Sequence, residues 1–409
     1  MCALLKPLAA FSVCVLTYSS LSSNVHAQEQ SVLIKGFVTP NSVPYTLAET
    51  VKRQSVGPLE GLNAWKKKLL DQTGLAFGLD NQTLYLGTNS ERSPSDAATN
   101  VFRFYGTWTT VARGTPDDGA LVFKVENRSA IANKTSAQAL GPSLGYAGLF
   151  ASTYSNQDWV LTNFYWRQRF AGGRGSLVIG QVDVNDYLNV NAASSPWNAF
   201  TNYEFEQQST SPGPSQGLGG ALLWRLDENW AVMGGIANAN GNPADPVNSA
   251  NMLFETGETF KHIGVGWSPK WSDRGNQLLQ LTFWQKDERT IAGVPSGHGI
   301  SFTASGRTGA WRPFFRAGYA DGAGTALDRS VSIGTTYDAR GGADLAGVGL
   351  NWGRAPGSTR DQFSLEAFYR YDAIDFLEIT PQVQYVVNPA NDPSTNDILS
   401  LGLRMRVAF

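Results

Sequence analysis

Apolar and polar side chains alternate along the last twelve residues of the chain, ILSLGLRMRVAF. Counting back from Phe409 in steps of two gives an apolar set of Val407, Met405, Leu403, Leu401 and Leu399. The opposite parity is mostly polar or small and includes Arg404 and Arg406. A period of two predicts a β-strand, because successive side chains of a strand point to opposite faces. The apolar face of this strand would pack either on a second sheet or on lipid.

The same alternation recurs through the chain and predicts sixteen strands, an even number as in single-chain bacterial membrane barrels. The predicted strands are 75–87, 101–112, 120–131, 158–170, 174–187, 217–226, 230–239, 259–268, 277–289, 298–307, 311–321, 329–338, 343–353, 361–372, 376–387 and 396–409.

Charged residues recur on the polar faces of these segments, and aromatic residues end several of the apolar faces. The terminal aromatics include Tyr319, Trp352, Tyr371 and Phe409. A membrane barrel carries aromatic girdles where its wall meets the two interfaces, whereas a soluble sandwich has no reason to place aromatics at its strand ends. The pattern therefore favours an all-β fold, a 16-stranded antiparallel transmembrane β-barrel, over a soluble β-domain.

The predicted connections alternate in length, as they do in barrels with short periplasmic turns and long outer loops. Tight turns fall at 171–173 and 227–229, and long loops fall at 132–157, 188–216 and 240–258. Part of the first long loop, LGYAGLFASTYS, could also form a strand. An odd strand count would invert the alternation, so we expect a loop there.

The first 27 residues have the pattern of a secretory signal peptide. An apolar run follows Lys6, and small and polar residues lead to a predicted cleavage after Ala27. Lipidation at Cys14 is the alternative, but residues 11–13 lack the Leu-then-small pattern that it needs. Both cysteines of the chain lie in this segment, so the exported part has no predicted disulfide.

A short periplasmic segment, residues 28–73, is expected before the barrel of residues 74–409. Within it, PLEGLNAWKKKLLDQ (58–72) has the spacing of an amphipathic helix. Its apolar stripe consists of Leu62, Trp65, Leu69 and Leu70. The helix is predicted to pack at the periplasmic mouth of the barrel, with a plug inside the lumen as the alternative.

Composition agrees with an exported barrel. The chain from residue 28 onward has 31 basic and 34 acidic residues, so no basic excess points to nucleic acid. Mean hydropathy is −0.22, and no later apolar run approaches the roughly 20 residues of a spanning helix. The 43 glycines and 12 tryptophans suit strand bends and aromatic girdles, so we expect the bacterial outer membrane as the location.

No catalytic or metal constellation is apparent. GPSLG (141–145) matches the nucleophile-elbow pattern, but that motif needs a strand before the serine, a helix after it and a histidine base. Here it falls in a predicted Gly/Pro loop, and only His262 and His298 remain after the signal peptide. No cysteine survives export and the two histidines lie in different strands, so no metal site is predicted and no cofactor is implied.

Inward-facing arginines beside aromatic rings are the strongest candidates for a binding surface. Guanidinium groups donate in a planar fork and stack on rings, which suits the hydroxyls and apolar faces of a sugar. The alternative is that these charges only hydrate the channel and brace its wall. The predicted pore-lining residues are Arg103, Arg167, Arg169, Arg312, Arg316, Arg370, Arg404, Arg406, Glu366, Trp284 and Phe368.

A barrel of sixteen strands leaves an aqueous channel, so loops must narrow it to give selectivity. Outer loops seldom gather aromatics without a partner, so the aromatic-rich loops are expected to fold inward. The predicted constriction residues are Trp197, Phe200 and Tyr203 in one loop and Tyr146 in the other.

The C-terminal run FYRYDAIDFLEITPQVQYVVNPANDPSTNDILSLGLRMRVAF resembles the C-terminal signature of the carbohydrate-selective OprB-type porins. In that signature an L-x-x-T-P-x-x-Q segment and an N-P-A loop lead into a closing G-L-R-x-R strand. LTNFYWRQRF, IGQVDVNDYLNV and GVGLNWGR are similar to the same family, and the resemblance spans about residues 58–409.

This resemblance implies a 16-stranded outer-membrane channel for monosaccharides such as glucose, with an arginine-lined eyelet. By motif match it implies that Arg167, Arg169, Arg370, Arg404 and Arg406 face the pore, several of them near the periplasmic ends of their strands. A general or anion-preferring porin is the alternative if the inward arginines are unpaired. An outer-membrane enzyme or an adhesive barrel is a weaker reading. Small-molecule sugars and membrane lipid are the expected partners, with the choice between a monomer and a homotrimer open.

Overall fold

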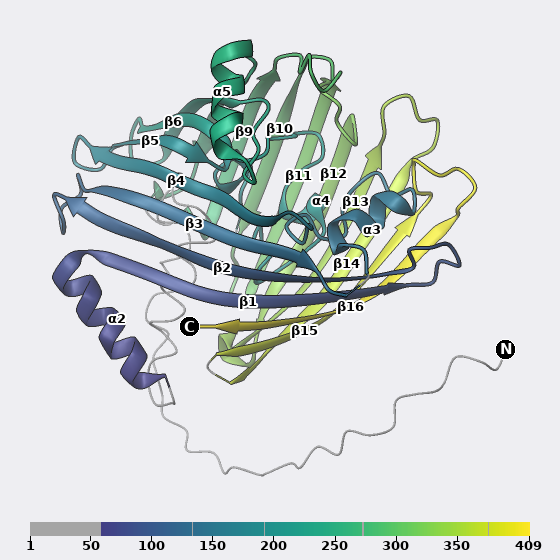
Figure 1. Ribbon diagram of the computed structural model, residues 1–409, viewed down its shortest axis with the longest axis horizontal. Coiled ribbons are helices and arrows are strands. Elements are labelled where there is room, and N and C mark those ends of the chain that lie inside the picture. The colour runs from purple at the N-terminus through teal and green to yellow at the C-terminus, as the bar shows by residue number, and fades with distance from the viewer. Residues whose placement is uncertain (1–58, 133, 192, 272–273, 375) are drawn as a thin grey trace, which may run out of the picture. The chain divides into compact units, whose positions relative to one another are not determined.

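Sixteen antiparallel strands form a closed barrel in the computed structural model, in which β1 pairs with both β2 and β16 (Figure 1). The structure describes residues 59–132, 134–191, 193–271, 274–374 and 376–409, so the predicted signal peptide and the segment 28–57 lie outside the described residues. The predicted all-β barrel of sixteen strands is confirmed.

The strands are β1 (Leu75–Thr88), β2 (Asp96–Val111), β3 (Gly119–Ala130), β4 (Asp158–Phe170), β5 (Gly175–Val182), β6 (Gly217–Arg225), β7 (Trp230–Asn238) and β8 (Thr259–Trp267). The second half consists of β9 (Gln277–Lys286), β10 (Gly297–Gly306), β11 (Trp311–Gly322), β12 (Arg329–Ala339), β13 (Asp344–Arg354), β14 (Gln362–Ile374), β15 (Leu377–Val387) and β16 (Asp397–Ala408).

Most strand ends lie within one or two residues of the predicted ones, but three differ more. Strand β5 ends at Val182 and not at residue 187, because the Asp183 side chain accepts from the Asn185 amide and starts the short 3-10 helix η1 (Val184–Asp186). Strand β9 ends at Lys286, just before Asp287, whose carboxylate accepts from the Thr259 amide at 2.9 Å. Strand β2 begins five residues earlier than predicted.

The two faces of β16 show what the alternation achieves. Leu399, Leu401, Leu403 and Met405 are exposed on the outer face of the barrel, whereas Ser400, Arg404 and Arg406 are buried on the inner face. Other strands expose aromatic or aliphatic side chains in the same way, among them Trp159, Phe283 and Leu350. An outer wall of this kind requires an apolar environment, which lipid supplies.

Helices occupy the long outer loops. The loop between β3 and β4 contains α3 (Ala137–Ser143), the β5–β6 loop contains α4 (Tyr203–Glu206), and the β7–β8 loop contains α5 (Pro246–Thr256). The segment 144–155 contains no strand, as predicted. The expectation of a plain loop at GPSLG was wrong, since Gly141, Pro142 and Ser143 end α3. A further 3-10 turn, η3 (Arg340–Gly342), joins β12 to β13.

The N-terminal helix, α2 (Glu60–Thr73), lies against the outer side of the barrel wall. Its Trp65 ring contacts the ring of Phe77 with the centroids 5.8 Å apart, and Phe77 has the outward parity of β1. The alternative of a plug inside the lumen therefore does not fit the contacts. None of the helices in the described residues is both long and apolar enough to cross a bilayer.

Candidate functional site

The longest connection of the described barrel, residues 183–216 between β5 and β6, folds into the lumen; we call it the inner loop. Its aromatic side chains Trp197, Phe200 and Phe205 are buried. Polar groups of the barrel wall hold its backbone on the side formed by β9 to β16. The inward folding predicted from its aromatics is thus what the structure shows.

Arg316 on β11 is the most extensively bonded of these wall groups, and its side chain is 0% exposed. One terminal nitrogen donates to the Phe205 and Gln207 carbonyls at 2.7 and 2.6 Å. The other donates to the Asn189 and Glu206 carbonyls at 3.0 and 3.1 Å and to the Ser194 hydroxyl. A planar guanidinium with five N–H groups can serve this many acceptors at once, which a lysine cannot.

Glu366 on β14 complements Arg316 by accepting where the arginine donates. Its carboxylate accepts from the Thr201 amide at 2.9 Å and from the Asn202 amide at 2.8 Å. Two residues along the strand, the Phe368 ring meets the Phe200 ring nearly edge-on, with centroids 5.0 Å apart. The wall therefore fixes this part of the inner loop through both its backbone and an aromatic contact.

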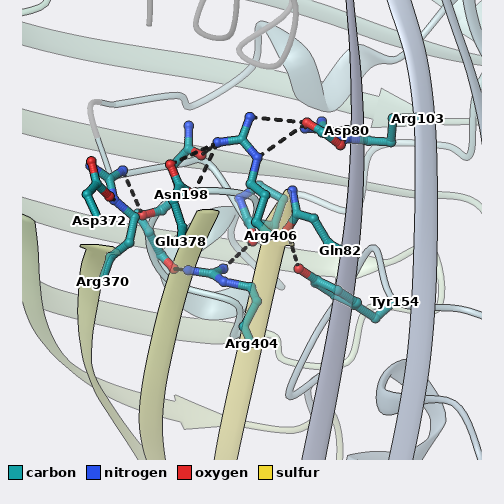
Figure 2. Close-up of polar contacts among 12 residues, drawn as sticks. Asp80, Gln82, Arg103, Tyr154, Asn198, Arg370, Asp372, Glu378, Arg404 and Arg406 are labelled. Carbon is teal, nitrogen blue, oxygen red and sulfur yellow. Dashed lines mark hydrogen bonds and ion pairs between the residues drawn. The ribbon is translucent and has the colours of Figure 1, made fainter. Parts of the chain in front are cut away.

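A cluster of arginines and carboxylates lies where the last strands meet the first (Figure 2). Two guanidinium nitrogens of Arg103 donate to the Asp80 carboxylate, and the centroid of the Trp197 ring lies 3.8 Å from the guanidinium carbon. Arg406 donates to Asp80 at 3.1 Å and to Glu378 at 3.2 Å. Arg103 and Arg406 are thus each paired directly with a carboxylate.

The same arginine cluster holds the tip of the inner loop. Arg406 donates to the Asn198 side chain at 2.7 Å, and Arg404 donates to the Pro196 carbonyl and, at 3.0 Å, to the Ala199 carbonyl. Arg370 reaches the Asn198 carbonyl at 3.4 Å and pairs with Asp372 (Figure 2).

The β3–β4 loop, residues 131–157, packs over the inner loop. The Tyr146 hydroxyl donates to the Asn202 side chain at 3.0 Å, and the Tyr154 hydroxyl donates to the Gln82 side chain at 2.8 Å. The Tyr203 amide donates to the Leu149 carbonyl at 3.0 Å. Two aromatic-rich loops are thus fastened to each other and to the wall.

A narrow polar cleft separates the inner loop from β3 on the opposite side of the lumen. Its volume is about 30 Å³, which is room for about two water molecules. Lys124 and Arg128 of β3 border one side, and the inner loop supplies acidic residues and Trp197 on the other. The bordering acids of the loop are Asp183, Asp186 and Glu206. Opposite charges therefore face each other across this cleft.

The ion pairs of Lys124 in the cleft are longer than those of the arginine cluster. Lys124 lies 3.7 Å from Asp186 and 3.9 Å from Glu126, while the Arg128 side chain donates to Glu126 at 2.7 Å. Burial raises the pKa of Asp186 to about 7 and that of Glu206 to about 8, although Lys124 opposes the first shift and a Ser152 hydrogen bond the second. These loop carboxyls therefore gain and lose protons near neutral pH.

The profile of a known protein family matches most of the barrel. The carbohydrate-selective porin family OprB matches residues 110–293 and 301–409. The chain belongs to the OprB family of carbohydrate-selective porins. It is therefore a porin of the bacterial outer membrane, and the family resemblance inferred from its sequence motifs is confirmed.

Solved structures resemble this porin in fold. The high-pH structure of Pseudomonas putida OprB aligns over 87% of this chain and 98% of its own, with 16% identity and a TM-score of 0.67. Its low-pH structure gives 15% identity and a TM-score of 0.53 over the same shares. The anion-selective porin of Comamonas acidovorans gives 12% identity and a TM-score of 0.52 over 82% and 98%. No curated protein sequence matches the chain significantly.

The predicted pore-lining residues of this porin fall into two groups. Those beside the inner loop are Arg103, Arg316, Arg370, Arg404, Arg406, Glu366, Phe368 and Trp284, whose indole donates to the Thr210 carbonyl at 3.0 Å. The second group lies near the periplasmic turns, away from the loop. There Arg167 and Arg169 share Asp118, and Arg312 pairs with Asp338 at 2.8 Å.

The constriction candidates Trp197, Phe200, Tyr203 and Tyr146 all lie in the lumen part of the two packed loops. Sequence reasoning missed the acidic side of the cleft, Asp186 and Glu206. Asp186 fell within the predicted strand 174–187, which ends at Val182, so its strand parity did not apply. Glu206 lies in a loop, which has no parity that tells inside from outside.

The nucleophile-elbow match has no catalytic setting in this porin. The Ser143 hydroxyl donates to the Leu140 carbonyl at 2.7 Å within α3, and no strand leads into the serine. Within the described ranges, no group of three or more His, Cys, Asp or Glu side chains could hold a metal ion.

Proposed function

We propose that this porin conducts neutral monosaccharides such as glucose by passive diffusion, and that they pass the polar cleft between β3 and the inner loop. The observation that carries the proposal is the facing of Lys124 and Arg128 against Asp186 and Glu206 across that cleft. A sugar hydroxyl both donates and accepts hydrogen bonds. A passage that offers donors on one side and acceptors on the other suits it better than an ion of either sign.

The pairing of the arginines supports a neutral solute over an anion. Arg103 and Arg406 pair with Asp80, Arg406 also pairs with Glu378, and Arg312 pairs with Asp338. An anion-preferring channel would need inward arginines whose charge is not cancelled nearby. The alternative of a general or anion-preferring porin therefore has less support.

The dimensions of the cleft indicate a constriction. Its volume of about 30 Å³ is far below the about 300–1,000 Å³ of pockets that enclose small molecules. Because a monosaccharide is several times larger than this volume, its passage requires the inner loop and β3 to move apart, and such a narrow point holds a solute only weakly.

The test is ion current through the purified porin in a planar bilayer, titrated with glucose and with an uncharged solute of similar size. We expect saturable block by glucose beyond that of the size control. Lys124→Met should raise the half-blocking concentration several-fold, whereas Lys134→Met, at an exposed pair with Asp96 in the β3–β4 loop, should leave it unchanged. Equal block by the sugar and the size control would instead indicate a general porin.

We also propose that the chain acts without catalysis. Support comes from the Ser143 hydroxyl, which is used within its own helix turn. Ser143→Ala should leave both the open current and its block by glucose unchanged. Hydrolysis of a chromogenic ester by the purified porin that the Ser143→Ala variant loses would contradict the assignment.

A further inference from the structure

We propose that α2 is a membrane-surface helix that binds anionic phospholipid of the periplasmic leaflet. Little of the described structure covers α2. None of its fourteen residues is buried. Leu62, Trp65 and Leu70 are 37%, 52% and 36% exposed, although they are three of the four large apolar side chains of the helix.

Two contacts fix α2 at one level of the barrel. The Trp65 ring meets the Phe77 ring at 5.8 Å, and the Trp108 indole donates to the Thr73 carbonyl at 3.2 Å. Phe77 and Trp108 lie at the periplasmic ends of β1 and β2, because β1 begins and β2 ends there (Figure 1). The helix is therefore tied to aromatic residues at the periplasmic edge of the lipid-facing wall.

The wall next to α2 is itself lipid-facing. The rings of Phe77, Phe104 and Phe123 follow one another across β1, β2 and β3 with centroids 6.0 and 5.2 Å apart. Phe104 and Trp108 are exposed on the outside. Aromatic side chains at this edge of a barrel sit at the headgroup level, so the exposed apolar side of α2 continues a surface that already meets lipid.

The lysines of α2 favour anionic phospholipid over neutral phospholipid. Lys66, Lys67 and Lys68 follow one another, and Lys66 lies over the Phe77 ring at 5.1 Å. Lys67 pairs with Asp71 at 2.7 Å in an exposed pair, which contributes little. Burial lowers the pKa of Lys66, as expected for an ammonium whose stem lies along an apolar surface. Lysines beside an apolar stripe are the signature of helices that lie on anionic membranes.

The occupant of this surface is thus the leaflet itself, and not a soluble ligand. Residues 62, 66 and 70 have the i, i+4, i+8 spacing of one helix face, and Ala64 lies on the opposite face. This difference gives a matched control within the same helix. Residues 28–409 contain no cysteine, so a single introduced cysteine can be labelled specifically.

The test uses the full exported chain with Leu62→Cys, Leu70→Cys or Ala64→Cys, each carrying an environment-sensitive fluorophore, in vesicles with spin-labelled phospholipid. We expect quenching by lipid spin labels at positions 62 and 70 to exceed that at 64 several-fold. Replacing Lys66, Lys67 and Lys68 by Gln should weaken this quenching in phosphatidylglycerol vesicles, by about fivefold per lysine in the underlying affinity, and not in phosphatidylcholine. Normal ion current through each variant establishes that the barrel has folded.

Two outcomes would overturn the proposal. Equal quenching at all three positions, together with access of aqueous iodide, would place the helix in water. Protection of positions 62 and 70 from both lipid spin labels and iodide would show that protein covers the helix, either residues 28–58 of the chain or a second copy.

Discussion

Two long outer loops of this barrel differ in position: one lies inside the lumen and the other outside it. The inner loop lies in the lumen, where Phe200 and Phe205 are buried. The β7–β8 loop, residues 239–258, remains outside and carries α5, in which Phe254 is 80% exposed and Val247 is 72% exposed. Aromatic side chains alone therefore do not decide whether an outer loop enters the channel.

The difference lies in where the polar groups of each loop find partners. The inner loop receives hydrogen bonds from wall residues such as Arg316 and Arg404, which stand on strands far away in sequence. The β7–β8 loop closes mainly on its own base, where the Asn238 side chain donates to the Ser249 carbonyl at 2.7 Å, and the wall contributes the Leu161 amide of β4, which donates to the Pro243 carbonyl at 2.8 Å. A loop enters the lumen when the wall can satisfy its backbone, because buried carbonyls without donors are costly.

Shortening the two loops gives the largest expected contrast. Replacing residues 197–205 by a short Gly-Ser linker should raise single-channel conductance several-fold, because it removes the tip that fills the lumen. Replacing 247–255, a segment of the same length in the β7–β8 loop, should leave conductance within the spread of the unmodified porin. Unchanged conductance after the first replacement would contradict the role given to the inner loop.

Removing Arg316, the principal wall donor to the inner loop, tests whether wall hydrogen bonds hold this loop in the lumen. Arg316→Met leaves four loop carbonyls without their donor, and we expect it to lower the free energy of unfolding by about 3–5 kcal/mol. Thermal unfolding in detergent and current noise in bilayers measure the effect. The matched control is Arg354→Met, which breaks a half-exposed pair with Asp361 worth about 0–1 kcal/mol.

The pH dependence should also distinguish the loops. The pKa values of Asp186 and Glu206 are raised to about 7 and about 8, so the cleft gains negative charge as pH rises from about 6 to 9. Cation preference, measured as reversal potential, should increase over this range. Glu206→Gln should remove the upper part of the change, whereas Glu255→Gln in α5 should not.

The stability effect of the same groups has a defined sign. Their carboxyls bind protons more tightly in the folded chain than in the unfolded one. The free energy of unfolding should therefore fall as pH rises from the unfolded pKa of about 4 through the folded values, by up to about 1.4 kcal/mol per pH unit for each group. A rise of stability over this window would contradict the raised pKa values.

The smallest effect is expected in α5. Phe254→Ser removes an aromatic side chain that is already exposed, so the free energy of unfolding should change by less than about 0.5 kcal/mol and the conductance should stay within the error of the current measurement. Phe200→Ser, the matched change in the inner loop, should destabilise the porin by several kcal/mol, since that ring contacts Phe205, Phe314 and Phe368.

The barrel could be predicted because its signal is local. Leu401 and Arg404 differ in parity, and parity alone assigns one to lipid and the other to the lumen. The end of β5 could not be placed this way, because Asp183 starts a new turn that apolar periodicity does not register. The two-residue spacing also continues through Asp287, whose partner Thr259 lies on another strand.

The candidate site was only half predictable for the same reason. Parity identified Arg316 and Glu366 as inward, but their partners lie more than a hundred residues away in a loop without periodicity. Sequence spacing therefore found the residues of the wall and not what they hold. Whether these side chains contact a passing sugar remains a prediction that the bilayer experiments above address.

The junction of β1 with β16 has a consequence for assembly. Asp80 near the start of the barrel is paired with Arg406 near its end, and the Phe409 amide donates to the Leu79 carbonyl at 2.8 Å. A chain interrupted anywhere before β16 has two open edges and an Asp80–Arg103 pair that lacks its second cation. Only a full-length chain, with β16 paired to β1, has no unpaired strand edge. Truncated chains keep two open edges that can pair with other chains and aggregate.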